Sequence, residues 1–213
     1  MTAIPRKRGR PAKSREVVPE ELLRQAFNMF AKEGFEAASL RKLAADSGVD
    51  FTLFRHYFGT KDQLWRAAVV AELTPLAEQL LQVLKSPQKE LGVVDALRQN
   101  ITAALLLAIA DRDRAGVLFK EPGDAERRDW LYSTFVAPYQ AQVDEAFKAA
   151  LEQKLIRPVP FESLHAMIIG VARMMVDPGM MSPRMAPLLK DKRKLKAYVE
   201  GAVAVLFEGL QAK

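Results

Sequence analysis

The spacing of hydrophobic positions predicts a chain built from helices, because no stretch keeps the apolar–polar alternation of a strand. From Pro19 apolar residues recur at helical spacing until Gly34, a residue type that commonly ends helices. Pro75 and Pro138 fall inside helical patterns, which they should kink or divide. We expect an all-α fold, with later helices over residues 40–47, 50–56, 60–84, 89–111, 115–120, 124–155, 161–176 and 190–211.

Residues with capping chemistry divide the N-terminal part into short helices. Ser39, Asp50 and Thr60 each precede a helical pattern and are suited to be N-caps. Gly48 lies between the second and third helices. This layout is that of a helix-turn-helix, although other small helical bundles share it. We expect residues 19–65 to form this domain and residues 66–213 a larger helical one.

Positive charge is concentrated in the first 18 residues. Six basic residues and one acid give this segment a net charge of +5, so the rest of the +6 chain carries only +1. Pro5, Gly9 and Pro11, without apolar periodicity, predict an arm that is disordered when free. A basic arm on a nearly neutral body indicates a polyanion partner, and a solvating tail is the alternative. The neighbouring helix-turn-helix favours DNA.

The composition excludes several classes of protein. Hydrophobic residues make up 49% and charged residues 27%, as in ordinary soluble proteins. Without Cys there is no disulfide, thiolate zinc site or Cys nucleophile. No uncharged apolar run approaches the ~18 residues of a spanning helix. No apolar stretch follows the basic N-terminus as in a secretory signal, so we expect a cytoplasmic protein.

Many short matches in the N-terminal third agree with one known family in order and spacing. They are Leu22-Leu23, Ala26, Met29-Phe30, Gly34-Phe35, Ser39-Leu40-Arg41-Lys42-Leu43-Ala44, Gly48-Val49-Asp50, His56-Tyr57-Phe58 and Thr60-Lys61-Asp62-Gln63-Leu64. Over about residues 19–65 the chain resembles the DNA-binding domain of the tetracycline-repressor (TetR) family. The resemblance implies a homodimeric transcription regulator, a repressor by default. Such a regulator would bind a palindromic operator and would leave it when a small-molecule effector binds to the helical remainder.

The resemblance also implies DNA contacts for individual residues. Arg41 would reach a base edge, and hydroxyl, phenol and ammonium groups suit phosphate oxygens. The third helix would present Phe51, Thr52, Leu53, Arg55 and His56 to the major groove, while Ser39, Tyr57 and Lys61 hold phosphates. Arg suits the paired acceptors of guanine. Arg55 stands where the family has an aromatic residue, usually Tyr, and Phe51 is unusually apolar for a groove-facing position, so no operator sequence carries over.

The arm contains a second motif. Lys7-Arg8-Gly9-Arg10-Pro11 holds the Arg-Gly-Arg-Pro core of AT-hook-like arms. Gly and Pro keep such a segment extended and thin, so Arg8 and Arg10 can lie in a narrow A·T minor groove.

The C-terminal region carries little charge. Between Glu162 and Asp177 the only charged residue is Arg173, with apolar residues all round the helix, which predicts burial on all sides. The resemblance implies that the last two helices pair with their copies in a four-helix dimer interface, and an intramolecular core is the alternative. Six of the eight Met residues lie between residues 167 and 185, either as packing or as an adaptable binding surface.

Arg173 also suggests an effector with an anionic group, because a buried guanidinium needs an anion. Asp177, four residues on, is the partner we favour, and a ligand carboxylate or phosphate is the alternative. The candidate ligand pocket consists of Phe119, Trp130, Phe135, Tyr139, His165, Arg173 and Met174.

Two other functions compete. An enzyme is disfavoured because Ser163 and His165 point apart on a helix, and no phosphate loop or metal-ligand cluster is present. We therefore expect no catalytic residue, metal or cofactor. An architectural DNA-binding protein without a ligand would also use the arm and the helix-turn-helix. Its weakness is the long apolar helical remainder, which exceeds what DNA anchoring requires.

Overall fold

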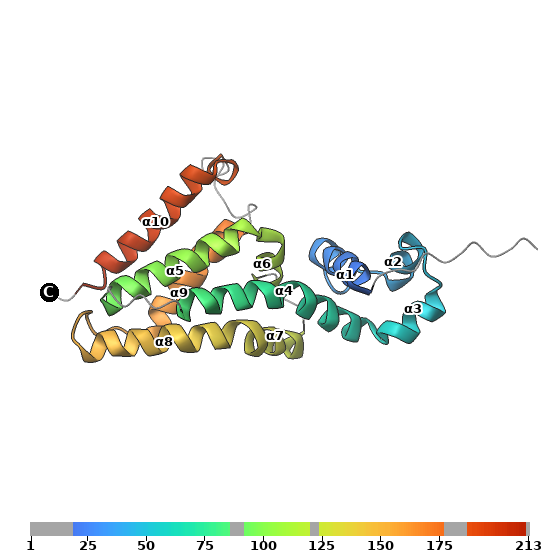
Figure 1. The fold of residues 1–213 in the computed structure, drawn as a ribbon, viewed down its shortest axis with the longest axis horizontal. Helices are drawn as coiled ribbons and strands as arrows, with labels where there is room; N and C mark the ends of the chain where they lie inside the picture. Colours follow the sequence, from blue (N-terminus) through green and yellow to red (C-terminus); the bar gives the residue numbers. More distant parts are fainter. Residues whose placement is uncertain (1–18, 86–91, 120–123, 177–186, 212–213) are drawn as a thin grey trace, which may run out of the picture. The chain divides into compact units, whose positions relative to one another are not determined.

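The computed structural model describes residues 19–85, 92–119, 124–176 and 187–211 of the chain. These residues are almost entirely helical, with one isolated bridge between Ile156 and Gln211 and no strand among them, so the all-α prediction is confirmed (Figure 1). The helices are α1 (Pro19–Glu33), α2 (Leu40–Asp46), α3 (Phe51–Phe58), α4 (Lys61–Lys85), α5 (Val93–Ala110), α6 (Arg112–Phe119), α7 (Ala125–Leu131), α8 (Ala137–Glu152), α9 (Phe161–Val176) and α10 (Lys192–Glu208), with a π-helical turn at Tyr132–Val136 and a 3₁₀ turn at Leu188–Lys190.

The chain divides into two compact units, residues 1–71 and 72–213, with the boundary inside α4. The first unit has its own core, to which α1, α2, α3 and the start of α4 all contribute buried apolar residues. Phe35 stacks on Phe30 at 5.8 Å and meets Trp65 edge-on at 6.1 Å. The buried apolar residues of this unit are Leu22, Ala26, Phe27, Phe30, Ala38, Leu43, Ala44, Phe54, Leu64, Trp65, Ala68 and Val69.

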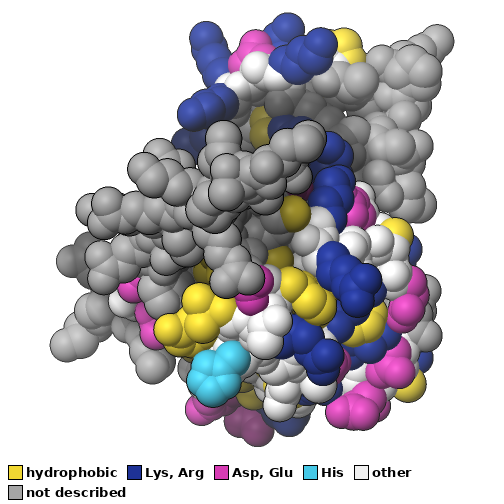
Figure 2. Space-filling model, turned by 90° about the vertical axis from the view of Figure 1, so that its right-hand side faces the viewer, with side chains coloured by type: hydrophobic (Ala, Val, Ile, Leu, Met, Phe, Trp, Pro, Cys, Tyr) yellow, Lys and Arg dark blue, Asp and Glu magenta, His cyan; other side chains and the backbone are white. Residues whose placement is uncertain are grey.

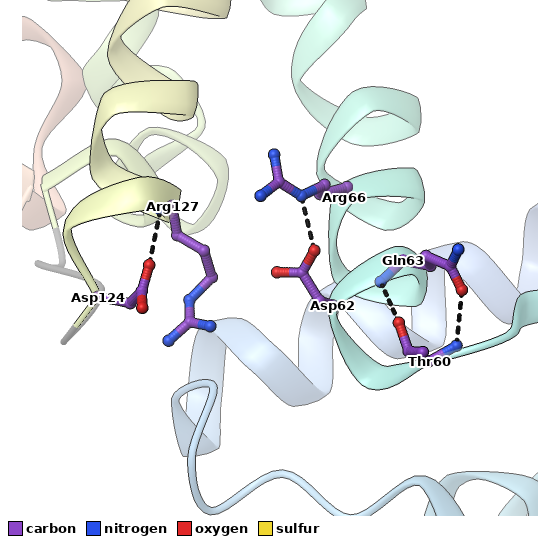
Figure 3. A network of polar contacts seen from close by, with 6 residues as sticks. All are labelled: Thr60, Asp62, Gln63, Arg66, Asp124 and Arg127. Carbon is purple, nitrogen blue, oxygen red and sulfur yellow. Dashed lines mark hydrogen bonds and ion pairs between the residues drawn. The ribbon is translucent and has the colours of Figure 1, made fainter.

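The predicted N-caps of the first unit are confirmed. The side chain of Asp50 accepts hydrogen bonds from the amides of Thr52 and Leu53, at 2.8 and 3.2 Å. Ser39 caps α2 in the same way through the amide of Lys42 at 3.4 Å. At α4 the Thr60 hydroxyl accepts from the Gln63 amide at 3.2 Å. The Thr60 amide in turn donates to Gln63 Oε1 at 2.9 Å, which completes a reciprocal capping box (Figure 3).

The core of the second unit lies between α5, α8, α9 and α10. Each helix contributes apolar residues three or four positions apart, as an amphipathic helix should. The most deeply buried members include Leu97, Ile101, Leu105, Val143, Phe147, Leu164, Met175, Val199, Val203 and Phe207.

Asp124 caps α7, and the hydrogen bond from the Arg127 amide lowers the pKa of its carboxyl (Figure 3).

The two internal prolines behave differently. The predicted helix over residues 124–155 is divided into α7, the π-helical turn and α8, and Pro138 stands in the first turn of α8. Proline has no amide hydrogen to donate there, so the wider π turn precedes it. By contrast, α4 continues through Pro75 without a break, so this proline does not divide its helix.

By length and composition alone, residues Lys61–Leu84 of α4 and Val93–Ala110 of α5 could cross a membrane. Both segments contain charged residues, so neither is an uncharged apolar run. In α5, Leu97, Ile101 and Leu105 belong to the core of the second unit, which is the ordinary role of an apolar helix in a globular domain.

The prediction that the helix containing Arg173 is buried on all sides is wrong for the single chain. One face of α9 is buried through Leu164, Ile168, Ala172, Met175 and Val176. On the opposite face Met167 is 56% exposed and Met174 38% exposed, and Arg173 is exposed as well. In the single chain the guanidinium of Arg173 is therefore accessible to water. Asp177 lies outside the described residues.

Candidate DNA-binding interface

A tight turn joins α2 to α3. Gly48 takes a φ of +68°, and its amide donates to the Ala45 carbonyl at 3.1 Å. The next amide, that of Val49, donates to the Ala44 carbonyl at 3.0 Å, which closes the end of α2. Because glycine has no Cβ, it adopts this left-handed conformation at little cost. Asp50 then starts α3 immediately, so the two helices follow one another as in a helix-turn-helix.

Phe54 anchors α3, since its ring is fully buried and lies 5.0 Å from Phe58. Neighbouring positions on the helix consequently point to solvent: Leu53 is 43% exposed and Tyr57 is 69% exposed. The other exposed residues of α3 are Thr52, Arg55 and His56. The residues that the sequence analysis assigns to the DNA-facing side of this helix thus lie on its accessible surface, and their contacts with DNA stay a prediction.

Phe51, the apolar residue at the start of α3, has a partner in α2. The guanidinium of Arg41 lies over the Phe51 ring, 5.4 Å from its centre. Such a cation–π contact restricts the arginine while leaving its donors free to hydrogen bond. The structure therefore offers a reason for an aromatic residue at position 51, because its ring supports the arginine, and the contact of Phe51 with DNA stays a prediction. This contact between two helices was missed by sequence reasoning.

Lys61 is already engaged within the first unit. Its ammonium donates a hydrogen bond to the Glu36 carbonyl at 2.9 Å and lies 4.9 Å from the centre of the Phe35 ring. The side chain thereby ties the loop after α1 to the first residue of α4. An ammonium has three donors, so a phosphate contact remains compatible with this arrangement. Ser39 is exposed, and its hydroxyl is used as the cap of α2.

Charge on the first unit is mixed. Among its residues from 19 onward, the exposed basic ones are Arg24, Lys32, Arg41, Lys42 and Arg55. Lys42 pairs with Glu33 at 3.3 Å, and Asp62 pairs with Arg66 at 2.7 Å (Figure 3). Figure 2 shows one face on which Lys and Arg side chains lie among acidic and hydrophobic ones. Arg8 and Arg10 of the arm lie outside the described residues.

Comparison with known proteins decides the family. Residues 22–68 match the model of bacterial regulatory proteins of the tetR family. The HTH-type transcriptional repressor Rv3405c of Mycobacterium tuberculosis is 31% identical over 139 residues, which cover 65% of this chain and 71% of that protein. The chain belongs to the TetR family. It is therefore a transcriptional regulator with a DNA-binding helix-turn-helix domain.

Further similarities agree with membership of the TetR family. The HTH-type transcriptional repressor AcnR of Corynebacterium efficiens is 27% identical over 140 residues, which cover 66% of this chain and 57% of the relative. Two solved structures share the fold. The TetR-family regulator PfmR of Thermus thermophilus has a TM-score of 0.63 at 16% identity, covering 92% of this chain and 99% of its own. SCO3833 of Streptomyces coelicolor has a TM-score of 0.64 at 17% identity, covering 94% of each chain.

The candidate pocket residues of this TetR-family chain are only partly brought together. Trp130 and Phe135 meet edge-on at 5.9 Å, and Phe135 is buried. His165 stacks on Phe161 at 6.0 Å, and its partial burial lowers its pKa. Arg173 and Met174 lie instead on the exposed face of α9. Phe119 is the last residue of α6, and its side chain lies outside the described part of the structure.

Tyr139 is the pocket candidate with the most unusual environment. It packs against the core of the second unit. Its hydroxyl is buried and has no hydrogen-bond partner among the described residues. Burial raises the pKa of this phenol well above its ordinary value, so the group stays protonated. A buried polar group without a partner is rare in proteins, and it is available to a polar atom of a bound molecule.

Proposed function

We propose that this protein is a cytoplasmic, homodimeric repressor that binds a palindromic operator and is released from it by a small molecule. The observation that carries the proposal is α3, in which one buried aromatic residue, Phe54, holds the helix while Arg55 and its neighbours are exposed. Residues 1–18 then serve as a DNA-binding arm, residues 19–65 as the DNA-binding domain, and residues 66–213 as the ligand-binding and dimerisation domain.

On the operator, α3 enters the major groove. Arg55 donates paired hydrogen bonds to a guanine, and Arg41, supported by Phe51, reaches a second base edge. Ser39, Tyr57 and Lys61 contact phosphates and set the register of the helix on the duplex. Arg8 and Arg10 follow the adjacent minor groove.

Dimerisation uses the exposed faces of α9 and α10. Met167 on α9 and Val205 on α10 are 56% and 70% exposed, and Gly170 and Gly201 on the same helices permit close approach. A second copy that covers these side chains would remove their apolar surface from water, which favours pairing. Two copies that pair these helices form a four-helix arrangement, and the two α3 helices then meet DNA about one helical turn, ~34–36 Å, apart.

Repression is supported by the relatives, since Rv3405c and AcnR are both named transcriptional repressors. The names of these relatives also agree with a non-enzymatic protein. Effector binding is supported by Tyr139, whose unpartnered hydroxyl can hydrogen bond a polar group of a small molecule in the second unit. A ligand releases DNA only if it binds the DNA-incompetent arrangement more tightly than the competent one.

Selection of bound DNA from a random pool tests operator recognition and symmetry together. We expect a two-fold-related consensus, and a dimer in sedimentation at micromolar concentration. A pool without consensus, or a protein that stays monomeric both free and on DNA, contradicts the proposal. The architectural alternative predicts DNA binding with no dependence on any small molecule.

A ligand screen tests release. Compounds are scored by the rise in melting temperature and by weaker binding to the selected site, for the natural protein and for Tyr139→Phe. We expect an effector to do both, with a smaller effect on the variant, which lacks only the hydroxyl. Arg157→Ala serves as the comparison, because its exposed side chain lies outside the candidate pocket and outside the helices α9 and α10 that are proposed to dimerise. If no compound does both, the sensor role is wrong.

A further inference from the structure

The start of α10 carries the densest positive charge among the described residues of the second unit. Residues 190–196 hold five basic residues and one acid, whereas the whole chain beyond residue 18 carries a net charge of only +1. All five basic side chains are exposed. Lys192 and Lys196 stand four residues apart on one helix face, where like charges destabilise the helix. The cluster lies outside residues 22–68, the part of the chain that matches the TetR DNA-binding domain.

The cluster borders a cavity of about 680 Å³. This volume falls within the range of small-molecule sites, roughly 300–1,000 Å³. Leu106 and Ile109, from the last turns of α5, and Leu195, from α10, form an apolar wall. Lys190, Lys192 and Lys196 line the same cavity. The pocket thus combines a hydrophobic surface with a cationic rim, contributed by segments about 85 residues apart in the sequence.

Only some of the charged side chains that line this pocket have an ion-pair partner. Asp111, Arg112 and Asp113 line the cavity as well, so the lining carries four basic and two acidic residues. Of the two carboxylates, that of Asp111 is paired with Arg114 at 3.1 Å. Lys196 lies 3.7 Å from Glu200. Within the described part of the chain, no carboxylate comes within ion-pair distance of Lys190 or Lys192. Two cations are therefore available next to an apolar wall.

We propose that this pocket binds an amphipathic anion, with an alkyl chain against Leu106, Ile109 and Leu195 and a carboxylate held by Lys190 and Lys192. Ammonium groups suit an anionic head. A small hydrophilic anion has no apolar surface to bury against the wall, so it should bind more weakly than an anion with an alkyl chain. The N-terminal amides of α10 are already used by the carboxylate of Asp191, which accepts from the amides of Arg193 and Lys194 at 2.9 and 3.1 Å, so the lysine side chains supply the positive charge of the site. The site differs from the Tyr139 environment, which lies in the core between the helices. Binding of the anion at this site does not depend on the proposed repressor function.

Calorimetric titration of the full chain with dodecanoate, kept below its micelle-forming concentration, tests the proposal. Dodecan-1-ol supplies the alkyl chain without charge, and acetate supplies the charge without the chain. We expect dodecanoate to bind more tightly than both. Equal binding of dodecanoate and dodecan-1-ol overturns the cationic rim, and equal binding of acetate overturns the apolar wall.

The chain offers matched variants. Lys190→Ala/Lys192→Ala removes two lining cations, and Arg193→Ala/Lys194→Ala removes two cations of the same cluster that do not line the cavity. We expect the first pair to weaken dodecanoate binding about tenfold, the effect of removing a charge-assisted hydrogen bond. The second pair should stay within roughly twofold, the effect expected of a screened surface charge. If both pairs weaken dodecanoate binding equally, the anion is attracted by the overall positive charge of the cluster and not by the cavity, which overturns the proposed site.

Two further variants keep the outcomes separate. Leu106→Gln places a polar group on the half-buried wall and should weaken binding, with folding checked by circular dichroism. Tyr139→Phe should leave dodecanoate binding unchanged. If Tyr139→Phe abolishes binding while Lys190→Ala/Lys192→Ala does not, the anion occupies the Tyr139 environment, which overturns the α10 site and supports the effector role of the core.

Discussion

Gly59 joins the DNA-facing helix α3 to α4, and replacing it by alanine should destabilise the first unit. Its backbone has φ +68° and ψ −124°, a combination that residues with a Cβ rarely adopt. A Cβ built at this position would lie 2.1 Å from Gln63 Oε1. That oxygen accepts the hydrogen bond from the Thr60 amide that completes the capping box of α4. Gly59→Ala therefore introduces backbone strain and breaks a cap at the same time.

The two effects can be added from the structure. An alanine in a sparsely populated backbone region costs about 1–3 kcal/mol. Moving Gln63 aside removes one hydrogen bond, about 0.5–1.5 kcal/mol. Gly48→Ala is the matched control, since Gly48 has the same φ of +68° but no atom within 4 Å of the built Cβ. It should cost only the left-handed strain, about 1–2 kcal/mol. We expect Gly59→Ala to cost about 1.5–4.5 kcal/mol.

Urea denaturation followed by tryptophan fluorescence measures these values. The chain has two Trp residues, and Trp65 is buried in the first unit, so a Trp130→Phe background makes the signal specific to that unit. The double variant Gly59→Ala/Gln63→Ala should cost less than the sum of the single variants, because the clash and the cap involve the same side chain. Equal destabilisation by Gly59→Ala and Gly48→Ala, or strict additivity with Gln63→Ala, would refute the reasoning.

Three further predictions concern DNA binding and pH. A double-mutant cycle with Arg41→Ala and Phe51→Ala, measured on operator affinity, should give a coupling of about 0.5–1 kcal/mol, and zero coupling would mean that the stacking seen at 5.4 Å has no influence on binding. Deleting residues 1–15 should make the slope of log affinity against log salt shallower by ~0.9 for each phosphate that the arm neutralises, and an unchanged slope would identify the arm as a solvated tail. Burial lowers the pKa of His165, so folding favours the neutral imidazole. Its contribution to the unfolding free energy should be fully present above pH ~6.5, the ordinary pKa of histidine, and should be lost as the pH falls from there through the folded-state pKa. His165→Gln should remove that part of the pH dependence in urea denaturation, and an unchanged profile would contradict it.

The parts of the fold that depend on local chemistry were predictable from the sequence. Ser39, Asp50 and Thr60 cap helices through amides two or three residues away, so the interaction and its signal lie in the same short segment. Gly34 and Gly48 have the positive φ that makes glycine a marker of helix ends. The first unit was consequently predictable almost element by element.

Contacts between distant segments were not predictable. Lys61 donates to the carbonyl of Glu36, 25 residues away, and Arg114 pairs with Glu72, 42 residues away. Nothing in the neighbouring sequence distinguishes such a lysine or arginine from a solvated one. The exposure of Arg173 was missed for a related reason: composition indicates that a helix is apolar, but only packing decides which face is covered. The cationic pocket likewise joins residues of α5 and α10 that share no sequence motif.

The most direct test of the account is whether Arg55 on α3 reads a base. Affinity is measured for the selected operator and for every single base-pair substitution of it, with the natural protein, Arg55→Ala and Arg55→Lys. The lysine variant keeps the charge but lacks the paired donors, so it separates base reading from phosphate attraction. We predict that both variants lose about 1–3 kcal/mol of discrimination at one base-pair position in each half-site and keep it elsewhere. Uniform weakening on every sequence by Arg55→Ala, with recovery by Arg55→Lys, would identify a phosphate contact and contradict the claim that Arg55 gives α3 its sequence specificity.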